Sequence, residues 1–149
     1  MKPSKIEFKN PRVYCFTHFA LSGIQCGIQS LHATVELCGA HGFGSKRSKN
    51  IEEWASHHKT VIVLNGGNSA MLKNLKEMLV DIEDGDGPVG LLDFATFEED
   101  DSTMGGIMTA IAVLVPEEIW GAETYDEDIP WSWYCRDFYN FMKGCRLAG

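Results

Sequence analysis

Several histidine and cysteine residues in this 149-residue chain have side chains that could bind a metal or act in catalysis. His32, Cys38 and His41 are possible zinc ligands, but their H-x5-C-x2-H spacing lacks the paired C-x2-C or H-x3-H units of structural zinc sites. His57 and His58 are expected at a helix end, where a positive charge is favourable to the helix dipole. A cysteine nucleophile with a histidine base stays open, and no motif supports it. We therefore predict neither a metal nor another cofactor.

A glycine turn in the middle of the chain is the second candidate for chemistry. The segment LNGGNSAMLK places two glycines between a predicted strand and a predicted helix, but its spacing matches neither GxGxxG nor GxxxxGK[ST]. Free amides at that helix start could bind an anion. A plain strand-to-helix turn is the simpler interpretation.

The charge and the cysteine content limit the classes of protein to which the chain can belong. With 13 Lys and Arg against 21 Asp and Glu, the formal net charge is −8, which opposes attraction to a polyanion such as tRNA. A local basic patch stays possible, because four basic residues lie in the first half of the chain: Lys46, Arg47, Lys49 and Lys59. Five cysteines without tight spacing are typical of reduced thiols. Because no apolar run is long enough for a membrane span and no signal segment is recognisable, we expect a cytoplasmic protein without membrane contact.

Hydrophobic periodicity predicts a three-layer α/β domain with helices on both faces of a sheet. Strands are expected at 12–18, 60–65, 88–93 and 107–115. Helices are expected at 22–39, after Asn50, from Asn68 or Ser69 to Gly85, and at 131–144. Because helices alternate with strands, we expect a mostly parallel four-stranded sheet.

Within this plan, residues 1–10 are expected to form a flexible arm and residues 11–149 a single domain. The acidic segment ATFEEDDSTMGG between the last two strands is expected to be an exposed, mobile loop. The first long helix has one apolar face, formed by a mixed three-and-four spacing of Ile24, Ile28, Leu31, Val35 and Cys38.

The last helix has an aromatic face made of Trp131, Tyr134, Phe138, Phe141 and Cys145. Together with its other rings, this helix carries more large side chains than one stripe against a small sheet can cover. We therefore expect a homodimer in which the helix contributes to the interface. The alternative is that the domain's own sheet and the linker at 121–129 cover both faces.

The segment YCFTHFALSGIQCGIQSLHATVELC resembles the opening of the class II peptidyl-tRNA hydrolases. In that family the first strand leads through a glycine-containing turn to a helix with the motif G-K-x-x-A-Q-x-x-H-A. Gln29, His32 and Ala33 match the Gln, His and Ala of this motif. The resemblance covers about residues 12–120 and implies a peptidyl-tRNA hydrolase II-like fold.

The order of the downstream elements is also similar to that of the family. A tryptophan segment at Trp54 precedes the apolar strand TVIVL, and a helix rich in leucine and lysine follows. Asp93 then stands at the end of the next predicted strand, and the run TAIAV that begins at Thr109 resembles the family's final strand.

Two departures from the family affect the expected chemistry. The family's lysine falls on Gln25, and its Asp-Ala-Gly-Arg-Thr motif is replaced by DFATF at residues 93–97. The resemblance implies a hydrolase of an ester or nucleotide-like substrate, in which Gln25 replaces the lysine as a donor and Asp93 orients or accepts a proton. His32 and Thr109 would position substrate or water. The alternative is a non-catalytic interaction module that keeps the fold and binds a protein through the aromatic helix or the acidic loop.

Overall fold

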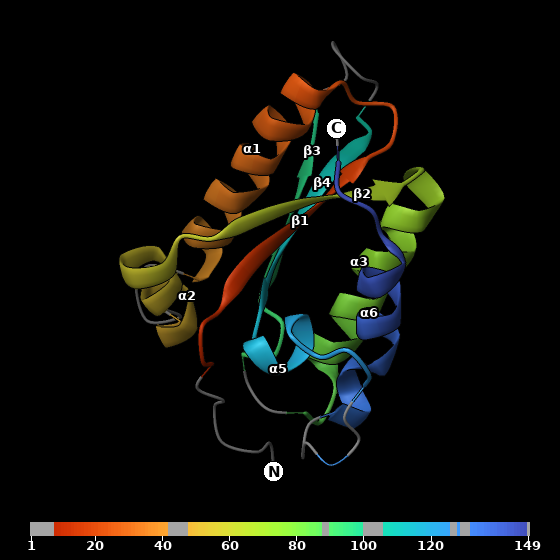
Figure 1. The fold of residues 1–149 in the computed structure, drawn as a ribbon. Coiled ribbons are helices and arrows are strands. Elements are labelled where there is room, and N and C mark those ends of the chain that lie inside the picture. Colours follow the sequence, from red (N-terminus) through yellow and green to blue (C-terminus); the bar gives the residue numbers. More distant parts are fainter. Residues whose placement is uncertain are drawn as a thin grey trace.

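The protein is built around a four-stranded sheet with the strand order β2-β1-β4-β3 (Figure 1). The computed structural model describes residues 8–41, 48–87, 90–99, 106–125, 128 and 132–148, without the side chains of residues 132 and 133. The strands are β1 (Arg12–His18), β2 (Val61–Gly67), β3 (Phe94–Glu98) and β4 (Met108–Val115). The predicted four strands are confirmed in number, and β1, β2 and β4 lie where the sequence predicts them.

The position of β3 differs from the prediction. The sequence predicts a strand at 88–93, but residues 90–92 form a turn in which Gly90 and Leu92 have φ angles of 84° and 53°. Such left-handed backbone ends an extended run. The strand begins at Phe94 and takes up the first residues of the segment predicted to be an acidic loop. Residues 88, 89 and 100–105 lie outside the described part of the chain.

The sheet is mixed, so the prediction of a mostly parallel sheet is wrong. β1 pairs with β2 in parallel, but β4 is antiparallel to both of its neighbours, β1 and β3. Only nine residues, 99–107, separate β3 from β4, which favours an antiparallel pair because a parallel pair requires a longer crossover. β4 therefore lies inside the sheet, between two strands that run in the opposite direction.

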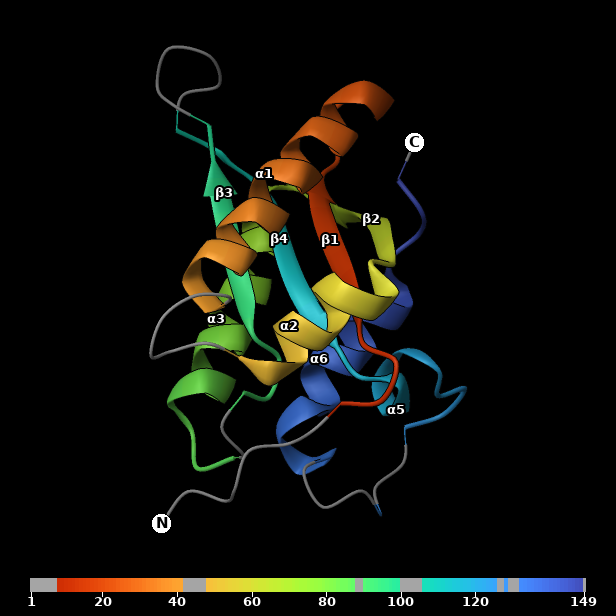
Figure 2. The same ribbon diagram turned by 90° about the vertical axis from the view of Figure 1, so that its left-hand side faces the viewer.

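Helices cover both faces of the sheet, as the sequence predicts (Figure 2). On one face lie α1 (Gly23–His41) and α2 (Lys49–Glu53), which continues as the π-helical turn η2 (Trp54–His58). On the other face lie α3 (Ser69–Asp84) and α6 (Ser132–Gly144), while the short α5 (Glu117–Trp120) follows β4. No helix in the described residues is both long and apolar enough to cross a bilayer.

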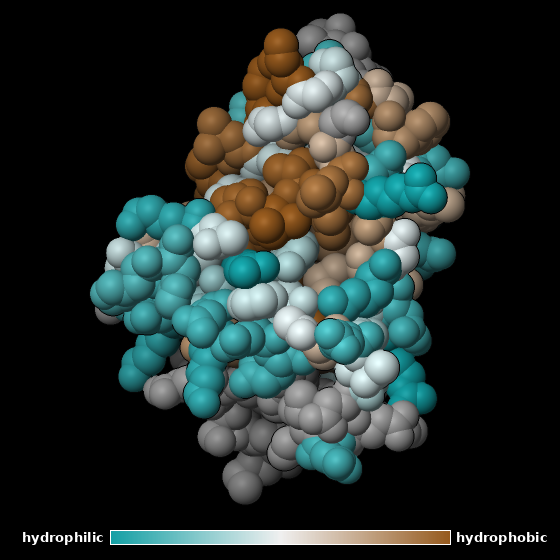
Figure 3. Space-filling model, in the orientation of Figure 1, coloured by the Kyte–Doolittle hydropathy of each residue, from teal (hydrophilic) through white to brown (hydrophobic). Residues whose placement is uncertain are grey.

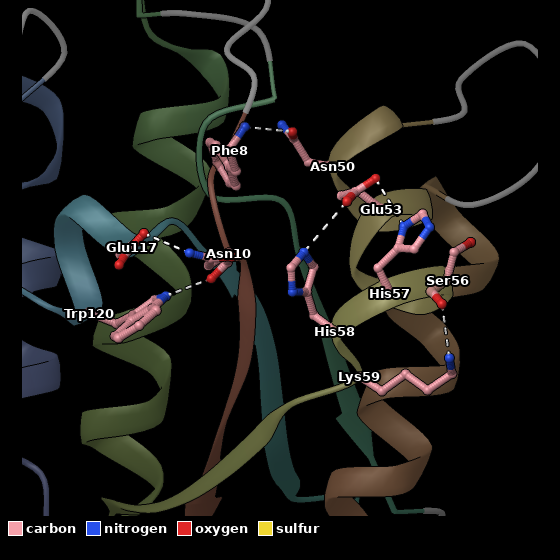
Figure 4. Close-up of polar contacts among 10 residues, drawn as sticks. All are labelled: Phe8, Asn10, Asn50, Glu53, Ser56, His57, His58, Lys59, Glu117 and Trp120. Carbon is pink, nitrogen blue, oxygen red and sulfur yellow. Dashed lines mark hydrogen bonds and ion pairs between the residues drawn. The ribbon is translucent and has the colours of Figure 1, made fainter.

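Side-chain capping sets the starts of α2 and α3. Asn68 accepts a hydrogen bond from the Met71 amide at 2.9 Å and caps α3, which confirms one of the two predicted caps. α2 is capped by Ser48 and not by Asn50, whose side chain instead accepts from the Phe8 amide at 2.9 Å (Figure 4). Phe8, near the end of the predicted flexible arm, is therefore buried against the domain, and residues 1–7 lie outside the described residues.

The apolar face of α1 points to solvent. Ile24, Ile28, Leu31 and Val35 expose 79%, 46%, 61% and 60% of their surface, and the helix instead buries Cys26, Gln29, Ser30, Ala33 and Leu37. An apolar helix face normally packs on the core. Here the sheet face below α1 presents the small side chains of Cys15, Ala110 and Ala112 from β1 and β4, and the larger Phe97 from β3. Ala33 and Leu37 of α1 pack on this face, whereas Ile24, Ile28, Leu31 and Val35 lie on the opposite side of the helix.

The aromatic face of α6 is mostly used inside the domain. Phe138 is fully buried and meets Phe16 of β1 edge to face, with the ring centroids 5.9 Å apart. Tyr139 donates a hydrogen bond to the Ala122 carbonyl at 3.0 Å, and its ring lies against Tyr125 of the linker. The domain thus covers Phe138 and Tyr139, whereas Tyr134 and Phe141 are half-buried. Trp131 and the side chain of Trp133 lie outside the described residues.

Two leucines on α1 test which face of the helix packs on the sheet. We expect Leu37→Ala to lower the free energy of unfolding by about 2–5 kcal/mol, because Leu37 is fully buried. The matched change Leu31→Ala should stay within about 0.5 kcal/mol, because Leu31 is exposed. Urea unfolding of dilute protein, followed by circular dichroism, measures both. A larger loss for Leu31→Ala than for Leu37→Ala would contradict the orientation of α1.

Candidate functional site

The end of the sheet where β1 and β2 finish is the place at which the topology favours a ligand. β1 and β2 are parallel neighbours, and the helices that follow them, α1 and α3, cover opposite faces (Figure 1). In open α/β sheets, ligands bind in the crevice at such a switch point, beyond the carboxyl ends of the strands. The start of β4 and the end of β3 lie at the same end of the sheet.

A histidine and a serine meet at this end. His18 is the last residue of β1 and is buried, and its Nε2 lies 3.1 Å from the Ser69 Oγ at the start of α3. The Ala20 amide donates to the His18 Nδ1 at 3.1 Å, which assigns the proton of a neutral ring to Nε2. His18 therefore donates to Ser69 and is not placed to remove the proton of that hydroxyl. The pair holds β1 to α3 and does not form an activated nucleophile.

Gln25, the residue at the position of the family's lysine, caps α1. Its Oε1 accepts from the Ser22 amide at 3.0 Å, and the Ser22 Oγ accepts from the Gln25 amide at 3.3 Å. This reciprocal pair is a capping box, which satisfies two free amides at the helix start. The side chain is exposed, and its oxygen is already engaged by the backbone.

Thr109 belongs to a buried polar chain that links α1, β4 and the residue after β3. Its Oγ1 donates to the Gln29 Oε1 at 2.7 Å, and the Gln29 Nε2 donates to the Glu99 Oε1 at 2.8 Å. Thr109 and Gln29 are both buried. Sequence reasoning did not assign Gln29 or Glu99 to a site. The match of Gln29 to the family motif was a usable signal, whereas nothing in the acidic segment distinguished Glu99.

His32 packs one turn further along α1. Its ring lies edge-on to Phe97 of β3, with the centroids 4.5 Å apart. Its Nδ1 is buried and has no hydrogen-bond partner. The ring therefore contributes mainly to the packing of α1 on β3, and the structure shows no polar contact between His32 and Thr109.

Asp93 lies at the other end of α1. Its Oδ1 is 3.8 Å from the Nδ1 of His41, the last residue of the helix. His41 follows Gln25 by sixteen positions in the helix, which corresponds to about 24 Å along the axis. The structure thus brings Thr109 close to Gln29 but does not bring Gln25 and Asp93 together. The catalytic roles of Gln25, His32, Asp93 and Thr109 stay predictions.

Four of the five cysteines offer little support for a thiol nucleophile. Burial raises the pKa of Cys15, Cys38 and Cys145, and it raises the pKa of Cys135 to about 12. A raised pKa lowers the fraction of thiolate at neutral pH, and the thiolate is the reactive form.

The two adjacent histidines contact one carboxylate (Figure 4). His57 Nδ1 and His58 Nε2 lie 3.2 and 3.5 Å from the two oxygens of Glu53. In the described residues, no group of three histidines, cysteines or acids is arranged to hold a metal ion.

A groove of about 510 Å³ runs between α3 and the strands β3 and β4. Its charged side chains carry both signs, so it has no marked preference for an anion or a cation. They are Lys73, Lys76, Glu77, Asp81 and Glu98.

The most distinctive surface is the exposed row Ile24, Ile28, Leu31 and Val35, which we call the α1 stripe. Figure 3 shows it as brown surface along α1, next to more apolar surface where β2 crosses the view. The helix carries a single acidic residue, Glu36, and no lysine or arginine. A row of large aliphatic side chains on one exposed helix face is typical of an interaction surface, whereas single exposed apolar residues are not.

No model of a known protein family matches this chain, and no characterised protein was found with a similar sequence. The function is therefore inferred from the geometry of the residues.

The raised thiol pKa values give a test of cysteine chemistry. We expect iodoacetamide to leave Cys135 unmodified in the folded protein at pH 8, because a thiol with a pKa of about 12 is almost wholly protonated there and is buried. In urea the same thiol should react fully. Mass spectrometry of the digested protein measures the modified fraction. Rapid alkylation of Cys135 in the folded protein would contradict the assignment.

Proposed function

We propose that this protein is an interaction module that binds a protein partner through the α1 stripe. The observation that carries the proposal is the outward orientation of four large aliphatic side chains at positions i, i+4, i+7 and i+11 of one helix. This spacing places them on a single face. The proposal keeps the interaction-module alternative drawn from the sequence and moves its binding surface from the aromatic helix or acidic loop to α1.

The exposure of the stripe costs free energy that a partner could recover. Complete burial of an aliphatic side chain contributes about 1.5–3 kcal/mol. Scaled by their exposed fractions, the four side chains would together contribute roughly 4–7 kcal/mol on binding. The fold itself buries only part of these side chains, because α1 contacts the sheet through its opposite face.

A divergent hydrolase, the other function suggested by the sequence, has less support from the geometry. Its donor, Gln25, accepts the hydrogen bond that caps α1, and its acid, Asp93, lies at the far end of that helix. Thr109 is buried and donates to Gln29. A catalytic set requires its groups within reach of one reacting atom.

We expect the purified protein to hydrolyse peptidyl-tRNA poorly or not at all. Gln25 does not supply the charge of the family's lysine, and a net charge of −8 opposes binding of a polyanion. The measurement is release of free tRNA from an N-acetylated aminoacyl-tRNA, with an authentic class II hydrolase as the positive control. Turnover comparable with that enzyme would refute the prediction. If turnover also survived in a Gln25→Ala variant, position 25 would not be catalytic.

The binding surface itself is tested by selecting peptides from a random library on the immobilised protein. We expect enriched apolar peptides whose binding falls at least about tenfold in a Leu31→Asp variant, because a carboxylate in the stripe resists desolvation. The matched control is Met71→Asp, which places the same charge at an exposed apolar residue of α3. If no selected peptide depends on Leu31, or if both variants lose binding equally, the proposed surface is wrong.

A further inference from the structure

We infer that the partner of the α1 stripe is the same helix of a second copy of this chain, packed antiparallel about a two-fold axis. This inference rests on the proposed function, because it names the partner of that surface. It differs from the dimer expected from the sequence, which placed the contact on the last helix.

The spacing of the stripe suits an antiparallel self-contact. The four residues of the stripe are separated by intervals of four, three and four positions along the chain. The pattern therefore reads the same in both directions. An axis between Ile28 and Leu31 places Ile24 opposite Val35 of the second copy, and Ile28 opposite its Leu31. Each member of the stripe then meets another member. A two-fold interface requires this kind of self-complementarity.

The surroundings of the stripe allow two helices to approach closely. Gly27 and Gly39 flank it, and a Cβ added at either position would have no atom within 4 Å apart from the neighbouring helix backbone. Each glycine therefore leaves open space beside the stripe. No stripe position carries a charge or a polar group that would be buried without a partner.

The low acid content of α1 favours this helix as a surface for self-association. Two copies with a formal charge of −8 each repel each other, so contact is least unfavourable where acids are sparse. α1 has one acid in 19 residues, Glu36. In an antiparallel pair, Glu36 lies near the N-terminal end of the other helix, where the dipole favours a negative charge. A parallel pair would place the two Glu36 side chains together near the unfavourable C-terminal ends.

The area of the stripe indicates a weak, reversible dimer. A buried aliphatic side chain removes on the order of 100 Å² of apolar surface from water, so the partly exposed stripe supplies roughly 250 Å² per copy. A standard interface buries about 800 Å² per partner, with an apolar centre inside a polar rim. The stripe can form such a centre, and we expect a dissociation constant on the order of micromolar.

Sedimentation velocity over ~1 to ~200 µM protein tests for the dimer. The wild-type chain should shift from monomer to dimer with increasing concentration. Leu31→Asp should raise the dissociation constant at least about tenfold, because it buries two carboxylates near the axis. Met71→Asp should leave it unchanged, and circular dichroism of each variant verifies folding.

The register is tested by mixing two variants, Ile28→Lys and Leu31→Asp. Each should be monomeric alone, because its introduced charge would face an apolar side chain of the second copy. Their mixture should form a heterodimer, because the antiparallel contact places the introduced ammonium of one variant opposite the introduced carboxylate of the other.

The oligomeric state of the wild-type chain and of the variants decides between the possible partners. A wild-type chain that stays monomeric throughout overturns the second copy as partner. If stripe-dependent peptides are nevertheless selected, the proposed function stands and its partner is a different protein; if none are selected, both fall. A dimer that survives Leu31→Asp lies on another surface and also overturns the inference. Loss of the dimer in both variants without recovery in the mixture overturns the antiparallel register.

Discussion

The close packing of α1 on the small side chains of β1 and β4 is the constraint on which the rest of this structure depends. Cys15 of β1 lies with its Sγ 3.7 Å from the Ser30 carbonyl oxygen, so the strand side chain contacts the backbone of the helix. Only small or slender residues fit such a contact. The helix turns Ala33 inward, together with Gln29 and Leu37, and the four aliphatic residues of the α1 stripe lie outside. The candidate interaction surface is a consequence of how the core is packed.

The opposite face of the sheet has the reverse character. Phe16 and Ile111 point toward α3 and α6, which supply leucines and aromatic rings, including the fully buried Phe138. This layer is thick enough to take up the described rings of α6, and the linker residue Ala122 satisfies the hydroxyl of Tyr139. Strand side chains alternate between the two faces of a sheet. Successive residues of β1 therefore pack against a thin layer on one face and a thick layer on the other.

The polar residues at the end of the sheet are joined in pairs that hold elements together. His18 connects β1 to α3, and Gln29 connects α1 to both Thr109 and Glu99. Such buried pairs stabilise the fold, because an unpaired buried polar group is costly. The same pairing leaves these groups less available to a substrate.

The sequence by itself determined the number of strands, the positions of β1, β2 and β4, the main helices and the cap at Asn68, because these follow from local periodicity and hydrogen bonding. It also identified the apolar row on α1. Only the tertiary structure decided which way that row faces, since this depends on the size of side chains from β4, which is distant in sequence. The central, antiparallel place of β4, the turn before β3 and the separation of Gln25 from Asp93 were likewise decided by long-range packing, which no local pattern encodes.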